Sequence, residues 1–522
     1  MNSYQDVLKA NLPRLINLYE QNPASAYTGI GDRMHVGWKM QDFANGTYQG
    51  GVHALAIAIK LNLVSNADAI LNLIDQIIRG ISVIMHSDGS LDEAYPSERS
   101  FCVTALAAFD ALSALHLLED RVLEKDRDEY LAIIHPLIGH LENNDEHHAI
   151  ISNHLATAVA AIVLWNKHSD EQCTRYRYFL DRIYKHQSEE GWFMEYEGAD
   201  PGYQTLCTYY LAAAQEHLQD ETLAAALDRS IRFLSYFIHP DGSIGGLYGS
   251  RNTEVFYPGG LMYLSAFNPM CNSIMSFMEH PEHHQVQVTP SAIDAGNFIP
   301  LLNAYAFAAY HYHEEKAMDT DLPCTRNFEK SFSEAGIFIK STDQYYAITN
   351  FKKGGTVKIY NKKDKSLDVE DGGLLGYLVN NTRFSTQMYD QMQSFSDRTI
   401  HTRFYLINDA MPTPFKFLIL RGLSITLFKS LRFGTIFKKK IVGMLMTSKK
   451  PITGIAQRSF HFNEEEVVIR EDITPPKGLK SIGHVGKFRA IHMASSGYHA
   501  HVILQKKPSA HSQFLRIESH VH

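Results

Sequence analysis

Polar residues that could carry chemistry stand at the starts of apolar segments. Asn153 and His154 open SNHLATAVAAI, Tyr203 opens YQTLCTYYLAAA, and Arg99 stands just before FCVTALAAF. An amide, an imidazole, a phenol and a guanidinium can all donate hydrogen bonds to a polar ligand. If the apolar segments are helices whose starts meet, these side chains form one site. That site favours an anion, because helix starts carry unpaired N–H groups and a partial positive charge.

The loops before these segments carry the side chains of a sugar-binding surface. Aromatic rings can stack on the apolar faces of sugars, while carboxylates and amides bind hydroxyl groups. The loops are rich in Gly, Asp and Asn and hold aromatic residues beside acids and amides. The predicted substrate-binding residues are Arg99, Glu98, Trp192, Glu197, Tyr248, Arg251 and Asn252.

The apolar segments repeat with a period near 50 residues, which is typical of stacked helical hairpins. Buried segments, apolar nearly all round, alternate with amphipathic ones, so the former should be inner helices and the latter outer helices. About six hairpins fit residues 1–313, and a closed or partly open (α/α) toroid would gather the loops at one mouth. The inner helices are predicted to start near Gly51, Arg99, Asn153, Tyr203, Gly260 and Asn297, separated by 48, 54, 50, 57 and 37 residues.

A second domain of different character follows. Short segments rich in β-branched and aromatic residues, often alternating, run from residue 331 to 522 and predict an antiparallel β-sandwich. Residues 314–330 are the predicted linker. The charge divides in the same place: up to residue 330 there are 21 basic and 42 acidic residues, and after it 28 basic and 15 acidic.

Composition excludes several classes of protein. With 45% apolar and 20% charged residues over 522 positions, the chain is globular, neither disordered nor fibrous. The five cysteines are scattered and never form CxxC, so we expect reduced thiols in a cytoplasmic protein without a signal peptide or membrane-spanning helix. The sequence contains no zinc-finger, RNP or helix-turn-helix signature, so nucleic acid is not an expected partner. The oligomeric state is left open.

Three stretches resemble heparinase II/III-like polysaccharide lyases. SNHLATAVAAI at 152–162 looks like the Asn-His helix start of that family, and EEGWFMEYEGADPGYQTLCTYYLAAA at 189–214 is similar to its loop in which Gly-Tyr follows an acidic turn. EAGIFIKSTDQYYAITNFKKGGTVKIYN at 334–361 resembles the start of its C-terminal β-sandwich domain. With the repeat, the resemblance covers most of the chain. It implies a carbon–oxygen lyase that needs no organic cofactor and acts on an acidic polysaccharide or oligosaccharide.

The resemblance also implies a mechanism, β-elimination at a uronic acid. Carried onto this sequence, Asn153 neutralises the uronate carboxylate, His154 is the base or orients it, and Tyr203 is an acid or base. Arg99 and Arg251 are our additions from the expected geometry, as further positive charges. Many family members also place His-x-His-x-Asp in the β domain, whereas the corresponding KGGTVKIYNKKDKSLDVEDGG contains no histidine.

Other functions use the same scaffold. Return of a proton to the other face of C5 would make the protein a uronyl C5-epimerase. Hydrolysis needs two carboxylates about 5–10 Å apart, which Glu195, Glu197 or Asp200 opposite Glu93 or Asp88 could supply. A non-catalytic glycan-binding protein of polysaccharide assembly is a further alternative. A terpene-cyclase-like toroid ranks last, because the sequence lacks DDxxD and DxDD.

Two further features have competing interpretations. Residues 411–453 contain nine Lys or Arg and no Asp or Glu, among apolar residues. The favoured prediction is a pair of strands with basic outer faces, and the alternative is peripheral contact with an anionic membrane, a long acidic glycan or a lipid-linked glycan. The histidine runs at 279–284 and 311–313 lack a convincing ligand set, so no metal is predicted at the site. A structural divalent metal held by β-domain histidines stays open.

Overall fold

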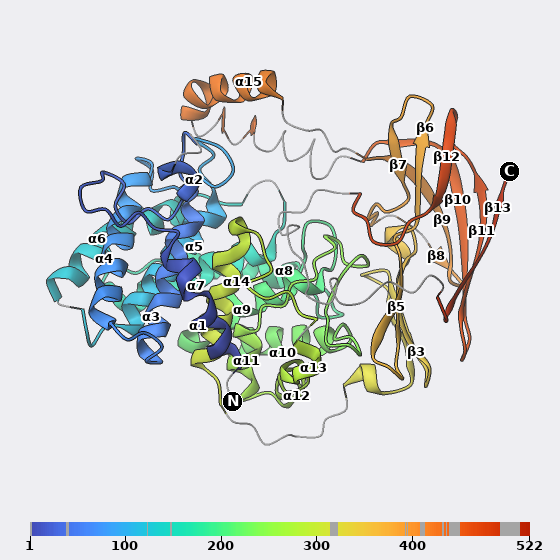
Figure 1. The fold of residues 1–522 in the computed structure, drawn as a ribbon, viewed down its shortest axis with the longest axis horizontal. Coiled ribbons are helices and arrows are strands. Elements are labelled where there is room, and N and C mark those ends of the chain that lie inside the picture. The colour runs from blue at the N-terminus through green and yellow to red at the C-terminus, as the bar shows by residue number, and fades with distance from the viewer. Residues whose placement is uncertain are drawn as a thin grey trace.

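The computed structural model describes residues 3–37, 41–122, 124–146, 149–284, 286–313, 322–391, 393, 395–407, 413–430, 433–434, 436–437, 449–490 and 512–522. Helices fill the N-terminal part and strands most of the C-terminal part, as Figure 1 shows. None of the helices in these ranges is both long enough and apolar enough to span a bilayer.

The inner helices of the toroid begin where the apolar segments begin. They are buried nearly all round, and each starts within two residues of its predicted marker, as the repeat requires. The inner helices are α3 (Val52–Lys60, preceded by η1, Gly46–Gly51), α5 (Phe101–Leu117), α7 (Ser152–His168), α9 (Pro201–Leu218), α11 (Gly259–Ser265) and α14 (Ala295–Tyr310).

The outer helices are amphipathic and bury one face against the inner ring. They are α1 (Ser3–Ile16), α4 (Ala67–Ile84), α6 (Glu124–Asn143), α8 (Arg175–Lys185), α10 (Glu221–Ser235) and α12 (Pro269–Glu279); the short helices α2 (Arg33–Val36) and α13 (Pro281–His284) lie in connections.

The ring closes on itself. Each inner helix packs against the next, and α14 returns to pack against α3. Each outer helix covers one inner helix, and the last inner helix, α14, is covered by the first helix of the chain, α1. Six hairpins therefore form a closed (α/α) toroid, as the sequence predicts.

Aromatic rings fill the centre of the toroid. Phe109 of α5, Tyr209 and Tyr210 of α9 and Phe307 of α14 form a connected cluster with ring-centroid distances of 4.7 to 6.2 Å. A ring of six helices leaves a central space that only large side chains can fill to normal packing density. This explains why the inner segments carry aromatic residues where an ordinary amphipathic helix would be polar.

The strands form two sheets. The first has the order β1 (Phe328–Phe332), β2 (Ile337–Ser341), β3 (Tyr345–Asn350), β4 (Thr356–Asn361), β5 (Ser366–Asp371), and all of its pairs are antiparallel. The second sheet has the order β12-β6-β7-β9-β10-β11-β13, with β8 paired to β9. Its strands are β6 (Leu374–Leu378), β7 (Arg383–Ser385), β8 (Phe395–Ser396), β9 (Thr399–Leu406), β10 (Pro451–Phe462), β11 (Val467–Thr474), β12 (Leu479–His484) and β13 (Leu515–Val521). Only the β11–β13 pair among these described strands is parallel.

The first sheet lies between the second sheet and the toroid. Tyr345 and Val357 point into the sandwich core together with Phe460 of the second sheet. Tyr346 and Tyr360, on the opposite face, belong to the same apolar core as the toroid helices. Every residue of β3 and β4 is buried for this reason, including the polar Asn350 and Lys358, which have partners in the toroid.

A buried ion cluster holds the second sheet to the end of the first. Arg458 Nε lies 2.6 Å from Glu471, and its Nη2 lies 2.7 Å from Asp371. Its Nη1 donates to the carbonyls of Gly354 and Gly355. Burial alone would raise the pKa values of Asp371 and Glu471. The positive charges of Arg458 and His484 instead hold both pKa values at about 2. Removing the arginine would leave two carboxylates in the core without their main counter-charge.

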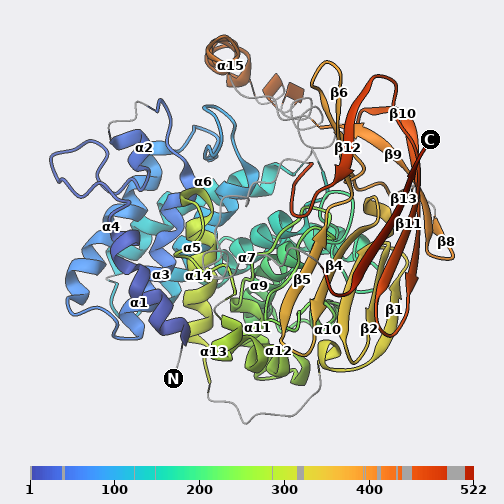
Figure 2. The same ribbon diagram turned by 45° about the vertical axis from the view of Figure 1, so that its right-hand side comes forward.

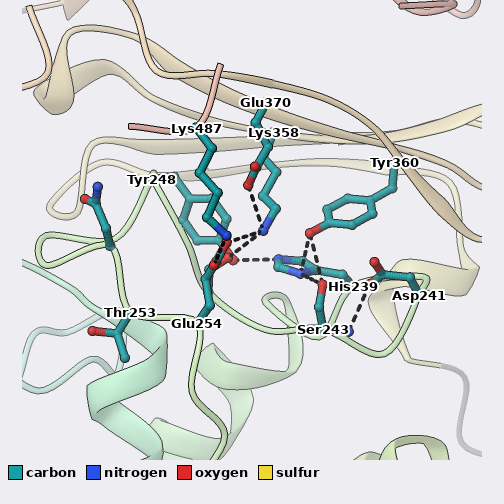
Figure 3. A network of polar contacts seen from close by, with 12 residues as sticks. His239, Asp241, Ser243, Tyr248, Thr253, Glu254, Lys358, Tyr360, Glu370 and Lys487 are labelled. Atoms are coloured by element: carbon teal, nitrogen blue, oxygen red, sulfur yellow. Dashed lines mark hydrogen bonds and ion pairs between the residues drawn. The ribbon is translucent and has the colours of Figure 1, made fainter. Parts of the chain in front are cut away.

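A polar network joins the toroid to the first sheet (Figure 3). His239 is fully buried, and its ring nitrogens lie 2.7 Å from the hydroxyls of Tyr248 and Tyr360. Lys358 of β4 lies 3.1 Å from Glu254 of the toroid and 3.2 Å from Glu370 of β5. Burial lowers the pKa of His239, so its neutral ring serves as a hydrogen-bonding bridge between the two parts.

Of the strands predicted in residues 411–453, those over residues 414–429 are wrong, whereas residues 451–453 do begin a strand, β10. Residues Pro414–Ile425 form a helix, α15, followed by η4 (Leu427–Lys429). Thr413 caps the helix by accepting from Lys416 N, and Pro414 occupies the first turn, where proline is favoured. Two segments with strand composition, AIHMA at 490–494 and HAHVILQ at 499–505, lie outside the described residues except for Ala490. The first strand, β1, begins at Phe328, within the predicted linker.

Candidate functional site

The starts of α7 and α9 are held together by the loop that precedes α9. The N–H and the hydroxyl of Ser152 both donate to the carbonyl of Met194, at 3.2 and 2.8 Å. Tyr196 N donates to the carbonyl of Ile150 at 2.9 Å. This short β-like pairing fixes residues 194–196 directly beside the first turn of α7.

Asn153 forms a buried pair with Glu195. Its Nδ2 donates to Glu195 Oε2 at 2.8 Å, and both residues are almost fully buried. Burial, and then the nearby carboxyl of Asp200, raise the pKa of Glu195 to about 8, against the lowering effects of Asn153 and Arg251. At neutral pH this carboxyl is therefore protonated, so it is able to donate a hydrogen bond to another carboxylate.

His154 has an acid of its own. Its Nδ1 lies 2.6 Å from Glu146 Oε2, and Glu146 is buried while the imidazole is partly exposed. A carboxylate on one ring nitrogen fixes the orientation of the ring and favours a proton there. The Nε2 atom is then the one available to accept a proton.

Asp200 organises the next helix start and the facing loop. Its Oδ1 accepts from Tyr203 N at 3.1 Å, as the N-cap of α9. Its Oδ2 accepts from Arg251 N at 2.8 Å and Thr253 N at 3.4 Å. One buried carboxyl thus positions Tyr203 and Arg251 relative to each other.

Tyr196 lies among the charged groups of this region. The guanidinium of Arg251 stacks over its ring at 4.2 Å, and Glu195, Tyr203 and Glu146 also act electrostatically on its hydroxyl. Burial raises the pKa of Tyr196 far above its usual range, while Arg251 opposes that rise. Its φ of +59° is a left-handed conformation that a tyrosine rarely adopts; such strain clusters at functional sites.

The β-sandwich reaches into the same region through Lys353. Its ammonium is fully buried and donates to Asn252 Oδ1 and to the carbonyl of Gly249. Burial lowers the pKa of this amine to about 7. Asn252 also donates to Gln387 Oε1 at 3.3 Å, so two segments of the sandwich hold the loop that carries Arg251.

The structure brings most of the predicted catalytic residues into one region. Asn153, His154 and Tyr203 stand on the first turns of adjacent inner helices, and Arg251 of the next loop stacks on Tyr196 beside them. The side chain of Asn252 instead contacts Lys353 and Gln387 of the sandwich. Glu197 lies in the same loop as Glu195, with its carboxylate 2.6 Å from Lys449.

Two predicted residues have contacts in a different loop. Arg99 Nη1 lies 2.6 Å from Asp88, and its Nη2 donates to the carbonyl of Lys429. Glu98 accepts from Glu93 N and Ala94 N of its own loop. A substrate-binding role for Arg99 and Glu98 stays a prediction without a contact to the Asn153 cluster.

The burial of two aromatic residues contradicts the prediction that their rings stack on a sugar. Trp192 is in the core, and its Nε1 donates to Glu190, which also accepts from the backbone of Glu334 and Ala335. Tyr248 is fully buried within the His239 network (Figure 3). Neither ring has a face open to a sugar. Large aromatic residues before helix starts serve here as packing between the two domains.

Sequence reasoning missed several members of this region. Glu146 stands eight residues before His154, in a loop whose acids gave no sign of which one would turn inward. Lys353 and Gln387 belong to the other domain, and no spacing rule connects them with Asn252. Glu195 was named only for the hydrolytic alternative, although its position before the Gly-Tyr helix start was a usable signal.

Other cavities and clusters lie away from this region. A cavity of about 60 Å³ is lined by His53, His116, His217, His311 and Glu216 together with apolar residues, none of them from the Asn153 cluster. In the described part of the chain, no group of three or more His, Cys, Asp or Glu side chains is arranged to hold a metal ion. All five cysteines are free thiols, four of them buried.

Comparisons with known proteins are informative at the level of structure. No family model and no curated protein matches the sequence. Chondroitin AC lyase of Streptomyces coelicolor A3, solved in complex with chondroitin sulphate, has 9% identity and a TM-score of 0.51, over 89% of this chain and 65% of that one. Xanthan lyase of Paenibacillus has 10% identity and a TM-score of 0.46, over 77% and 44%. Heparinase III has 10% identity and a TM-score of 0.46, over 77% and 67%.

The chain spans 44% and 65% of the length of xanthan lyase and chondroitin AC lyase, respectively. At these identities the likeness concerns the fold. This chain forms a closed ring of six helical hairpins followed by a two-sheet sandwich, and 89% of it superposes on the chondroitin lyase. The protein therefore has a polysaccharide-lyase-like fold, an (α/α) toroid followed by a β-sandwich.

Proposed function

We propose that this protein is a polysaccharide lyase-like enzyme that cleaves a uronate-containing acidic glycan by β-elimination. One observation carries the proposal: a neutral carboxyl–amide pair, a carboxylate–imidazole pair, a tyrosine and an arginine gather at adjacent inner-helix starts. Elimination needs an anion-neutralising group, a base and an acid, and this gathering supplies each of them.

Neutralisation of the substrate carboxylate is the first requirement. The proton at C5 becomes acidic only when negative charge can pass into the neighbouring carboxylate, so donors must face that group. Asn153 and the protonated carboxyl of Glu195 are such donors, and Arg251 adds a full positive charge nearby. Burial strengthens all three interactions, because little water is present to screen them.

Proton transfer completes the reaction. The C5–H bond breaks as the base takes the proton, its electron pair forms the C4–C5 double bond, and the C4–O bond breaks with the pair leaving on the glycosidic oxygen. In our assignment His154, held by Glu146, is the base and Tyr203 donates a proton to the leaving oxygen. The bonds balance without an oxidant or an organic cofactor.

The test is the ultraviolet absorbance of the conjugated double bond during incubation with a panel of uronate glycans. The wild-type protein should produce the absorbance with at least one of them. Tyr203→Phe and His154→Ala should lower the rate by about 100-fold or more, the contribution of a positioned acid or base.

Matched control variants come from the same scaffold. Tyr310→Phe alters an exposed tyrosine at the end of α14, and His401→Ala alters an exposed histidine of β9. Both should retain the wild-type rate. A rate that survives Tyr203→Phe and His154→Ala would refute the assignment, and exchange of solvent deuterium into C5 without absorbance would indicate a C5-epimerase.

Hydrolysis is the second candidate, favoured by the raised pKa of Glu195. A carboxyl that keeps its proton at neutral pH is what a glycosidase uses as a general acid. A hydrolase would release new reducing ends without ultraviolet absorbance and would lose that activity in Glu195→Gln. A lyase would show both signals together, so the two assays on one sample separate the functions.

A further inference from the structure

The helix α15 exposes large apolar side chains to solvent, which are usually buried in a protein that stays in water. Phe415, Leu418 and Ile425 are 70%, 69% and 67% exposed. Leu427, Phe433 and Ile436 extend the exposed apolar surface beyond the helix. Contiguous apolar surface of this kind marks an interaction site. In Figures 1 and 2 the helix lies at the edge of the molecule, outside both the toroid and the sandwich.

The helix has an attached side and an outer side. Phe415, Leu418, Gly422 and Ile425 follow a spacing of three, four and three residues, so they share one face. On the other side, Arg421 Nε lies 2.7 Å from Asp42 of the toroid, and Ser424 is buried. After the helix, buried Phe428 contacts the ring of Tyr95 at 6.0 Å. The toroid thus contacts the helix through Arg421 and Ser424 and leaves Phe415, Leu418 and Ile425 exposed. Phe417 and Ile419 of the same helix are also exposed, at 45% and 48%.

The charge of this segment has one sign. Residues 411–453 contain nine Lys or Arg and no Asp or Glu, although the whole chain has a net charge of −8. Lys416, in the first turn of the helix, and Lys429, after its end, are both exposed. Apolar side chains bordered by basic ones suit an anionic lipid bilayer, in which negatively charged headgroups cover a hydrocarbon interior.

We propose that α15 and η4 form a docking element for an anionic lipid membrane, lying flat in the headgroup region. A helix of twelve residues is about 18 Å long, too short for the roughly 30 Å of a bilayer core, so it would lie on the membrane. Phe, Leu and Ile side chains fit hydrocarbon better than glycan hydroxyls, and the absence of acids fits phosphate headgroups. This inference is independent of the proposed lyase activity.

Flotation of the full-length protein with vesicles tests the proposal. The vesicles are phosphatidylcholine alone, or phosphatidylcholine and phosphatidylglycerol in equal parts. The protein should float with the anionic vesicles at low salt and much less at about 1 M salt, where the Debye length falls to about 3 Å. The triple variant Phe415→Ser, Leu418→Ser, Ile425→Ser should lose about 100-fold or more in affinity. Lys416→Gln with Lys429→Gln should lose about 25-fold, or five-fold per charge.

A control variant matches the number and exposure of the apolar residues changed. Phe267, just after the end of α11, is 74% exposed, and Val379, just after the end of β6, is 71% exposed. Val83, in α4, is 53% exposed. Their replacement by serine should leave flotation unchanged. The proposal is overturned if the wild-type protein stays with the unbound fraction, or if the triple variant of α15 floats as well as the wild type. Retention on acidic glycan beads without flotation would also overturn it, in favour of a glycan-docking helix.

Discussion

Replacing Glu195 by glutamine should stabilise the protein more and more as the pH rises. Glu195 is buried beside Asn153, and its pKa is about 8 instead of the usual 4.5. Glutamine has nearly the same shape, keeps an oxygen that can accept from Asn153, and never ionises. The variant therefore isolates the cost of holding a carboxyl in this site.

The size and sign follow from proton linkage. The folded protein keeps a proton that the unfolded chain releases above about pH 4.5, so this group's contribution to stability falls between about pH 4.5 and 8 and is constant above that. The difference in pKa is about 3.5 (8 minus 4.5). At 1.36 kcal/mol for each pKa unit, the wild-type protein loses about 5 kcal/mol over that window relative to Glu195→Gln.

Urea denaturation at about pH 5, 6.5 and 8 measures the effect, with tryptophan fluorescence as the signal. Trp192 is buried three residues from Glu195 and reports on the same loop. The free energy of unfolding of Glu195→Gln minus that of the wild type should rise by about 1.4 kcal/mol per pH unit. An infrared band of a protonated carboxyl should disappear in the wild type near pH 8 and be missing from the variant.

A difference that does not change with pH would refute the reasoning. It would mean that Glu195 is ionised when folded, and that Asn153 donates to a carboxylate already neutralised by Arg251. The matched control is Glu197→Gln, a partly exposed position in the same loop whose carboxylate pairs with Lys449. If it produced the same slope, the effect would belong to the loop and not to the buried carboxyl.

Three further substitutions test the supports of the site. Arg458→Met should destabilise the sandwich by about 3–5 kcal/mol in urea denaturation, because it leaves two buried carboxylates with His484 as the remaining counter-charge. Gly198→Ala would place a Cβ 2.3 Å from Cζ of Tyr389, so it should lower the melting temperature, cost about 1–3 kcal/mol and reduce activity. Lys353→Met removes two buried hydrogen bonds across the domains; we expect a loss of about 2–3 kcal/mol and a lower rate in the absorbance assay.

Each of these has a control. Arg470 pairs with Glu518 on the exposed surface, so Arg470→Met should change stability by less than about 1 kcal/mol. Gly139 is in helix α6 with open space around its Cα, so Gly139→Ala should stabilise the protein by up to about 1 kcal/mol. Lys363→Met, in the loop after β4, should not affect the rate. Equal effects of Arg458→Met and Arg470→Met would contradict the burial argument.

The sequence by itself determined the fold class and predicted where a candidate site would lie. A helix that is apolar all round must be covered on all sides, and a repeat of such helices with amphipathic partners leaves few arrangements besides a toroid. Asn153 and Tyr203 were found because the starts of helices in a ring must meet. The strands β2, β3, β4, β9, β10 and β11 followed from their β-branched and aromatic composition. These are local properties, which a short stretch of sequence contains.

Only the tertiary structure decided which acids, bases and aromatic residues belong together. Glu146 and Glu195 became partners of His154 and Asn153 through a loop pairing that no period predicts. Trp192 and Tyr248 are aromatic residues of the kind that stacks on sugars, but the first sheet of the sandwich covers them. Residues 414–425 had the composition of a strand, but a cap and a contact with Asp42 stabilise a helix instead. Burial and the pKa of a side chain depend on groups distant in the chain, so they arise only when the two domains pack.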